Sequence, residues 1–490
     1  MQFVAEQIIA PRPITVGNVS VRAARLLSRV IFYGLLSLLA LAAIPYGTAE
    51  VWWTSLFESA VFTLTALCIV ESTLSGEYFV REHRMLLPLC ALILFIFAQS
   101  LPLSRGATGA LGIPLWNAIS ADPYESRLVA LKFIAFALVG ALLLRYTSTR
   151  RRLRALIHVV IGIGVASALF GIARLIMQRG ANAFVLPYLL TGTGYGQFIN
   201  RNHFAFLMEM ALGLILGLVI GRGVRREQRL VYLAAALAVW AALVLSNSRG
   251  AIFSMLGQML FLCLLFYAAR QERKDRRQTN APRRWRLSGT HIMRVALLAA
   301  LMLALIMGII WMGGDQLATK LESAPVEISA QGPDNRWGDR RREVWQTTWQ
   351  VIKENPLAGV GFGGYWIAIS QYHNASGKVT PQQAHNDYLE LLASGGLLGV
   401  LLWVWLAAAV IGRARACLRD SDSFRRAAYL GALVGVFGVA AHSLVDFGLH
   451  ITINALVCIT LLVIATVQVK SEDEVKSVAA FGDSPRAARS

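Results

Sequence analysis

Residues 150–177 have the sequence RRRLRALIHVVIGIGVASALFGIARLIM, in which four of the first five residues are arginine and the remainder is almost entirely apolar. A helix needs roughly 20 apolar residues to cross the hydrocarbon core of a bilayer, and residues 155–177 provide that length. Arginine and lysine collect on the cytoplasmic side of membrane proteins. This stretch therefore predicts a transmembrane helix whose N-terminal end faces the cytoplasm.

Apolar stretches of similar length recur along the chain. They predict an all-α polytopic membrane protein with about 12 transmembrane helices. The candidate spans are residues 30–46, 54–74, 85–103, 127–146, 155–177, 204–221, 229–246, 251–269, 295–313, 391–411, 427–447 and 451–469.

The composition agrees with a membrane protein. Of the 490 residues, 56% are hydrophobic and 15% are charged, and the mean hydropathy is +0.55. Such a chain has too few charges to cover the surface of a soluble protein. The net charge of +19 comes from short basic clusters between apolar stretches, which indicates cytoplasmic connections and argues against nucleic-acid binding. The five cysteines show no CxxC spacing, so neither disulfides nor a zinc site are predicted.

Connections rich in basic residues alternate with poorer ones, and this alternation sets the predicted topology. We expect a cytoplasmic N-terminus (1–29), nine transmembrane helices within 30–313, a long periplasmic loop (314–390), three more helices within 391–469, and a cytoplasmic tail (470–490). The tail is polar and is predicted to be disordered.

The long loop is expected to contain short helices. Residues with helical spacing predict an amphipathic helix that ends at Asn355-Pro356. The glycine-rich stretch 359–365 follows, and it predicts either a tight turn beside a ligand or helix, or a plain flexible turn. The residues that form the amphipathic pattern are Arg341, Trp345, Thr348, Trp349 and Ile352.

His385 is the candidate catalytic base, because it precedes an apolar span on the predicted outer side of the membrane. A neutral imidazole there can accept a proton from an attacking hydroxyl. The alternative is a histidine that caps the helix or lies at the membrane interface.

Two basic positions on the same side are candidates for binding phosphate. Arg249 ends the sequence SNSR (246–249), and the triplet Arg340, Arg341 and Arg342 begins the amphipathic helix. Guanidinium groups bind phosphate oxygens in pairs and keep their charge at neutral pH. The alternatives are a membrane anchor for Arg249 and a lipid-headgroup contact for the triplet.

Other polar residues at predicted outer boundaries are candidate accessory residues of the same site. The histidines among them are scattered and lack HxxxH or HExxH spacing, so no metal site is predicted. The accessory set is Arg201, Asn202, His203, Arg342, Asn386, His442 and Asp446.

From about residue 100 onward the sequence resembles the superfamily of O-antigen ligases and Wzy-type polymerases of bacterial inner membranes. The resemblance rests on an ordered set of segments. They are NRNHFAF (200–206), SNSRGA (246–251), RREVWQTTW (341–349), NPLAGVGFGGY (355–365), HNDYLELLASGGLLG (385–399) and HSLVDF (442–447).

This resemblance implies a helical glycosyltransferase of the GT-C type that works at the periplasmic face without metal, cofactor or nucleotide sugar. The donor would be a glycan on undecaprenyl diphosphate, and the acceptor a hydroxyl of lipid A core, another glycan or a protein. By the same resemblance His385 would act as the base, and Arg249 and Arg341 would hold the diphosphate.

Three alternatives to a ligase remain open from the sequence. A Wzy-type polymerase and a protein O-oligosaccharyltransferase would share the donor and differ in the acceptor. A transporter of lipid-linked sugars belongs to a different class, in which arginines would line a phosphate path near the bilayer midplane.

Overall fold

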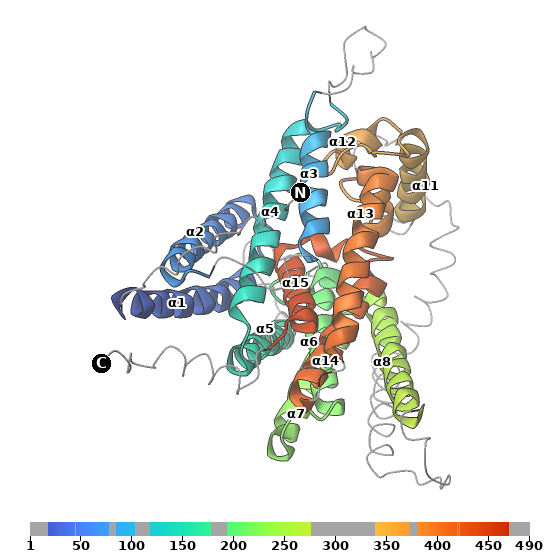
Figure 1. Ribbon diagram of the computed structural model, residues 1–490. Coiled ribbons are helices and arrows are strands. Elements are labelled where there is room, and N and C mark those ends of the chain that lie inside the picture. Colours follow the sequence, from blue (N-terminus) through green and yellow to red (C-terminus); the bar gives the residue numbers. More distant parts are fainter. Residues whose placement is uncertain are drawn as a thin grey trace, which may run out of the picture.

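The structure is a computed structural model (Figure 1). It describes residues 18–44, 46–77, 85–102, 118–177, 194–275, 339–372, 381–418, 420 and 422–469. Within these ranges the regular structure is helical, apart from one isolated bridge between Tyr195 and Phe198. The principal helices are α1 (Asn18–Ala42), α2 (Val51–Ser75), α3 (Leu87–Gln99), α4 (Pro123–Tyr146), α5 (Arg150–Met177), α6 (Arg201–Ile220), α7 (Arg229–Leu245), α8 (Arg249–Asp275), α11 (Asp339–Glu354), α12 (Tyr365–Ser370), α13 (Asp387–Cys417), α14 (Ser423–His442) and α15 (Thr452–Thr466).

Eight helices of the described chain are long and apolar enough to cross a membrane: α1, α2, α4, α5, α6, α7, α13 and α14. Three more, α3, α15 and the part of α8 up to Leu265, are apolar but shorter. These helices confirm the all-α, multi-pass architecture. The predicted span at 295–313 lies outside the described residues, so the total of about 12 remains a prediction.

Several helices begin earlier than the hydropathy pattern predicts. Helix α1 begins at Asn18 instead of residue 30 and includes Arg22, Arg25 and Arg29. Arginine is a good helix former, and its long side chain can reach polar surroundings from a helix that is otherwise apolar. Helix α13 begins at Asp387 instead of 391, because the Asn386 side chain accepts hydrogen bonds from the first free backbone N–H groups.

Helix α6 forms the centre of the bundle, and nearly all of its side chains are buried. It crosses α14 at two pairs of glycines, Gly213 with Gly435 and Gly217 with Gly431, whose backbones lie in direct contact. A Cβ atom at any of these positions would meet the backbone of the opposite helix. Small residues therefore allow the two helices to approach each other closely. This crossing positions the outer ends of both helices.

The amphipathic helix predicted in the long loop is confirmed as α11, which ends at Glu354 before Asn355-Pro356 as expected. Val344, Thr348 and Val351 on one face are buried, whereas Trp349 on the other is 49% exposed. Figure 1 shows α11 and α12 beside the N-terminal end of α13.

The glycine-rich stretch is a turn that packs against a helix. Helix α13 is broken at Gly396, which has a φ of 58°. At the break, backbone groups of α13 form hydrogen bonds with the turn instead of within the helix. The N–H of Val360 donates to the carbonyl of Ala393 (2.9 Å), and the N–H of Leu397 donates to the carbonyl of Pro356 (2.9 Å). Gly359 and Gly396 have positive φ values and lie in backbone contact with the opposite segment. Of the two readings of this stretch, the structure supports the turn beside a helix.

Candidate active site

His385 lies in a strained turn directly before α13. Its φ is 51°, a left-handed conformation that costs a residue with a side chain about 1–3 kcal/mol. Hydrogen bonds on both sides hold the turn. The Trp345 indole on α11 donates to the carbonyl of Ala384 (2.9 Å), and the Asn386 amide donates to the carbonyl of Leu444 (2.8 Å). The turn is thereby fixed to α11 on one side and to the segment after α14 on the other.

Asp446 is the residue on which the candidate site converges. Its side chain is 1% exposed, and its Oδ1 lies 3.4 Å from Nδ1 of His385. Its Oδ2 lies 3.8 Å from Nη2 of Arg341 and also accepts a hydrogen bond from the Asn202 amide. The Phe447 backbone N–H donates to Oδ1 (2.9 Å). Four separate segments of the chain therefore meet at one carboxylate.

The electrostatic surroundings keep Asp446 charged. Burial by itself disfavours the carboxylate, but the contact with His385 and the neighbouring His203 and Arg341 outweigh that effect. The pKa of Asp446 is consequently held well below its usual range.

The Asp446 contact also orients the His385 ring. Because Nδ1 faces the carboxylate, Nε2 is the nitrogen available to a substrate, and the side chain is 32% exposed. A carboxylate at Nδ1 favours the tautomer with the proton on that nitrogen, which leaves a lone pair on Nε2. The edge-to-face contact with Phe447, with ring centroids 4.8 Å apart, restrains the ring further. The arrangement can accept a proton from a bound hydroxyl.

Three arginines near this pair lie at or close to the N-terminal ends of helices. Arg201 begins α6, Arg249 begins α8 after the turn at Asn247, and Arg341 lies in the first turn of α11. Arg201 is close enough to Arg249 and Arg341 for the charges of both to act on it. Helix N-termini carry partial positive charge, which adds to that of the side chains. The arrangement can bind a polyanion such as a diphosphate.

The structure distinguishes between members of the predicted arginine triplet. Arg341 reaches Asp446, whereas the Arg342 side chain is exposed on the neighbouring face of α11. The side chain of Arg340 lies outside the described part of the chain.

Residues 233–404 match the sequence profile of the family described as O-antigen ligase. This segment belongs to the O-antigen ligase family. The matched region includes Arg249, Arg341 and His385, whereas Arg201 and Asp446 lie outside it. No curated protein matches the chain.

Two predicted accessory residues meet His385 through shared partners. Asn202 binds Asp446, and the buried His203 also makes an edge-to-face contact with Phe447, with centroids 4.8 Å apart. Asn386 serves as the N-cap of α13 and as a link to Leu444.

His442 is paired with a residue that the sequence does not predict as part of the site. Its Nδ1 lies 2.8 Å from Oε1 of Glu209, and both side chains are completely buried. Ser254 donates to the other Glu209 oxygen (2.8 Å), and the His442 ring stacks on Phe206. A Cβ atom on Gly250 would meet Nε2 of His442, so the pair lies directly behind Arg249. The available signal was a single glutamate within the otherwise apolar stretch 204–221.

A second polar group that the sequence does not predict adjoins His385 through Phe447. Nε2 of His450 lies 3.5 Å from Asp387 and 3.4 Å from Glu390, and its side chain is 41% exposed. Its ring contacts Phe447, with centroids 5.9 Å apart. The acidic residues in HNDYLE (385–390) were the signal. In the described ranges, no three His, Cys, Asp or Glu side chains are grouped as a metal site would require.

Proposed function

We propose that this protein transfers a glycan from undecaprenyl diphosphate to an acceptor hydroxyl, as an O-antigen ligase. The observation that carries the proposal is the contact of Asp446 with both His385 and Arg341, next to Arg201 and Arg249. One set of residues then combines a base with a site for the leaving group.

The arginines would hold the donor diphosphate. Arg249 and Arg341 were predicted to take this part, and the proximity of Arg201 to both supports adding it as a third cation. Positive charge fixed in advance stabilises the negative charge that develops on a departing phosphate. We propose that guanidinium groups supply this charge without a metal ion.

His385 would act as the general base. As the acceptor oxygen forms a bond to the anomeric carbon, the bond from that carbon to the phosphate oxygen breaks and its electron pair leaves with the diphosphate. The hydroxyl proton passes to Nε2 of His385, and Asp446 stabilises the imidazolium that results. A single displacement of this kind inverts the anomeric configuration.

The arrangement of charges supports a proposal for the face of the membrane on which the site lies. The segments that meet at Asp446 are connections that the sequence predicts on the outer side, and the arginine-rich connections lie at the other helix ends. We therefore propose a GT-C-type enzyme of the bacterial inner membrane with a periplasmic active site. A ligase acceptor is favoured over a polymerase or protein acceptor by the description of the matching family alone.

Reconstitution in liposomes with a lipid-diphosphate donor and an acceptor glycan tests the proposal. His385→Ala should abolish transfer while donor binding stays within a few fold of wild type. The matched control is His158→Ala on α5, which removes a histidine bonded to Tyr232 (2.9 Å) and should retain activity. Transfer by His385→Ala at the wild-type rate would overturn the role of the base.

The same assay separates the alternatives. A transporter would move the lipid across the bilayer and form no glycosidic bond. A product with retained anomeric configuration would contradict single displacement. Products built on lipid A core, on a second lipid-linked glycan or on a protein would identify ligase, polymerase and protein transferase, respectively.

A further inference from the structure

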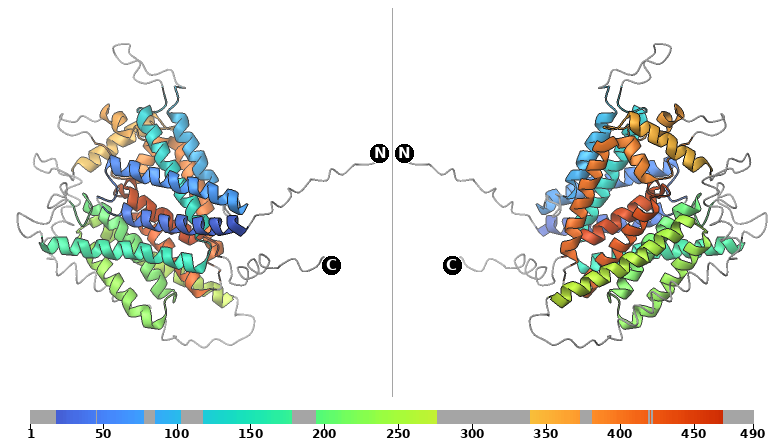
Figure 2. Two further views of the ribbon diagram at one scale, coloured as in Figure 1. Left: turned by 90° about the vertical axis from the view of Figure 1, so that its left-hand side faces the viewer. Right: turned by 90° about the vertical axis from the view of Figure 1, so that its right-hand side faces the viewer.

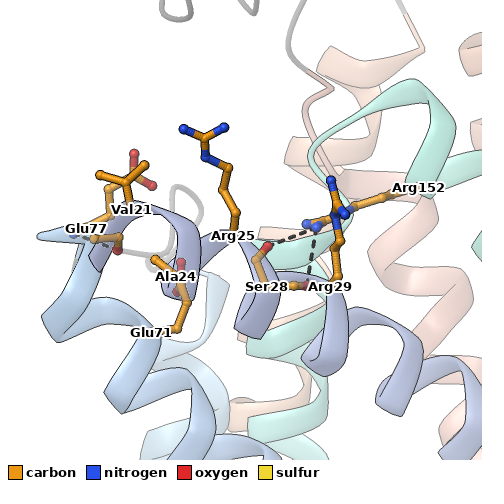
Figure 3. Close-up of a pocket in the computed structure, with 9 residues that line it drawn as sticks. Val21, Ala24, Arg25, Ser28, Arg29, Glu71, Glu77 and Arg152 are labelled. Atoms are coloured by element: carbon orange, nitrogen blue, oxygen red, sulfur yellow. Dashed lines mark hydrogen bonds between the residues drawn. The ribbon is translucent and has the colours of Figure 1, made fainter. Parts of the chain in front are cut away.

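A second cationic cavity lies away from the candidate active site, between the N-terminal half of α1, the C-terminal end of α2 and the start of α5 (Figure 3). Its volume is about 360 Å³, and Arg25, Arg29 and Arg152 line it. In the left view of Figure 2, this end of α1 and α2 lies on the opposite side of the molecule from α11. The chain segments that form the cavity are ones that the sequence predicts on the cytoplasmic side.

Arg152 is a fixed donor in this cavity. Its Nη2 donates to Oγ of Ser28 (2.9 Å) and its Nη1 to the carbonyl of Tyr146 (3.2 Å). The guanidinium also lies over the Phe32 ring, 5.1 Å from the centroid. A guanidinium held in one position by its own protein loses little freedom when it binds a ligand.

The three arginines that line the cavity outnumber its two acidic lining residues, Glu71 and Glu77. The carboxylate of Glu71 is bound by Arg145 (2.7 Å) and by the Tyr146 hydroxyl (2.9 Å). Across the described ranges, no carboxylate is within ion-pair distance of Arg25 or Arg29, both of which are exposed. Arg29 is also close enough to Arg152 for its charge to act on it. The remaining charge favours an anionic ligand.

Exposed apolar side chains lie on α1 close in sequence to the arginines that line the cavity. Leu26 is 63% exposed, Val30 is 47% exposed and Tyr33 is 56% exposed. Each lies one or a few residues from Arg25 or Arg29 on the same helix. A ligand with both a phosphate and hydrocarbon chains would satisfy the two kinds of surface at once.

We propose that this cavity binds the phosphate headgroup of an anionic membrane lipid at the cytoplasmic surface, with its acyl chains along α1. Arg25 and Arg29 contact the phosphate oxygens. Arg152, whose side chain is already held in place by hydrogen bonds within the protein, lines the site. The bound lipid ties the N-terminal half of α1 to α2 and α5. This site is independent of the glycan-transfer proposal.

Binding of fluorescent phosphatidylglycerol to the full-length protein in phosphatidylcholine nanodiscs tests the proposal. The double variant Arg25→Ala/Arg29→Ala should weaken binding by about tenfold or more, in line with the loss of two charges near a membrane surface. The matched control is Arg225→Ala/Arg226→Ala, which removes two exposed arginines from another predicted cytoplasmic connection and should bind as wild type. Size exclusion and thermal unfolding establish that both variants are folded.

Three results would overturn the proposal. Equal weakening in both double variants would reduce the effect to general surface charge. Unchanged binding in Arg25→Ala/Arg29→Ala would remove the cavity as the site. Competition by inorganic phosphate as effective as that by unlabelled lipid would identify the ligand as a free phosphate instead of a headgroup.

Discussion

The buried carboxylate of Asp446 joins two residues from different parts of the chain: Oδ1 lies 3.4 Å from Nδ1 of His385, and Oδ2 lies 3.8 Å from Nη2 of Arg341. The proposed base and one of the proposed diphosphate ligands therefore share a partner. A change at Asp446 should consequently affect chemistry more strongly than any other change that leaves both residues in place.

Asp446→Asn should lower kcat by about 10³-fold, because an amide neither stabilises the His385 imidazolium nor enforces its tautomer. Donor binding should change much less. Single-turnover transfer and donor binding, measured separately, check this result. Asp420→Asn, which weakens an ion pair with Arg425 (2.9 Å) far from the site, is the control. Equal kcat values for the two variants would contradict a role for Asp446 in catalysis.

The depressed pKa of Asp446 predicts how stability depends on pH. Because the folded-state pKa lies below the unfolded value, the stabilisation from the charged form is present above the unfolded pKa and is lost as the pH falls through the folded pKa. The Tm difference between wild type and Asp446→Asn should thus not decrease from about pH 8 to pH 5 and should shrink only in stronger acid. Thermal unfolding in detergent across this range measures it. A difference that halves between neutral pH and pH 5 would refute the assignment.

The effect of replacing an arginine should depend on whether its side chain lies in the site. Arg201→Ala, Arg249→Ala and Arg341→Ala should each lower kcat/KM for the lipid-diphosphate donor by about 10²-fold, since each removes a charge from the leaving-group site. Arg342→Ala should stay within a few fold, because its side chain is exposed on the neighbouring face of α11. Steady-state kinetics with donor as the varied substrate decide the matter. A larger loss at Arg342 than at Arg341 would shift the assignment by one residue.

Breaking the buried pair behind Arg249 should destabilise the bundle. Glu209→Ala leaves His442 buried without its 2.8 Å partner, and the expected cost is about 3–5 kcal/mol. Reversible unfolding in mixed micelles gives the value. Glu227→Ala, an exposed glutamate, should change stability by less than about 0.5 kcal/mol. A neutral effect at Glu209 would show that the pair does not contribute to stability.

The break in α13 should tolerate only glycine. At Gly396 a Cβ atom would strain a φ of 58° and meet the carbonyl of Leu357, so Gly396→Ala should cost more than about 1 kcal/mol. Gly412→Ala in the same helix meets no atom within 4 Å and should be neutral or stabilising. Thermal unfolding of the two variants compares them directly. Equal effects would mean that the break is not needed for stability.

Much of the architecture follows from local sequence. Spans such as 155–177 and 204–221 are visible because apolar length and flanking charge are properties of one continuous segment. The amphipathic pattern predicts α11 and its end at Asn355-Pro356 for the same reason. The hydropathy pattern predicts later starts for α1 and α13 than the structure shows. Hydropathy does not detect polar helix formers such as arginine or a capping asparagine.

The composition of the site depends on helices that are far apart in sequence. His385 and Arg249 stand out as single residues in recognisable segments, but the sequence does not show that His385 faces Asp446 or that Arg201 lies near Arg249. The sequence predicts Asp446 and Arg201 only as accessory residues. It does not predict Glu209 as the partner of His442.

The sequence by itself determined an all-helical membrane protein and, through its basic clusters, the predicted side on which each connection lies. Only the tertiary structure decided which polar residues meet. The physical reason is that periodicity and charge are set within a segment, whereas contacts across segments depend on how the helices cross. The glycine contacts of Gly213 and Gly217 with α14 are such a crossing, and α14 leads directly into the segment that carries Asp446.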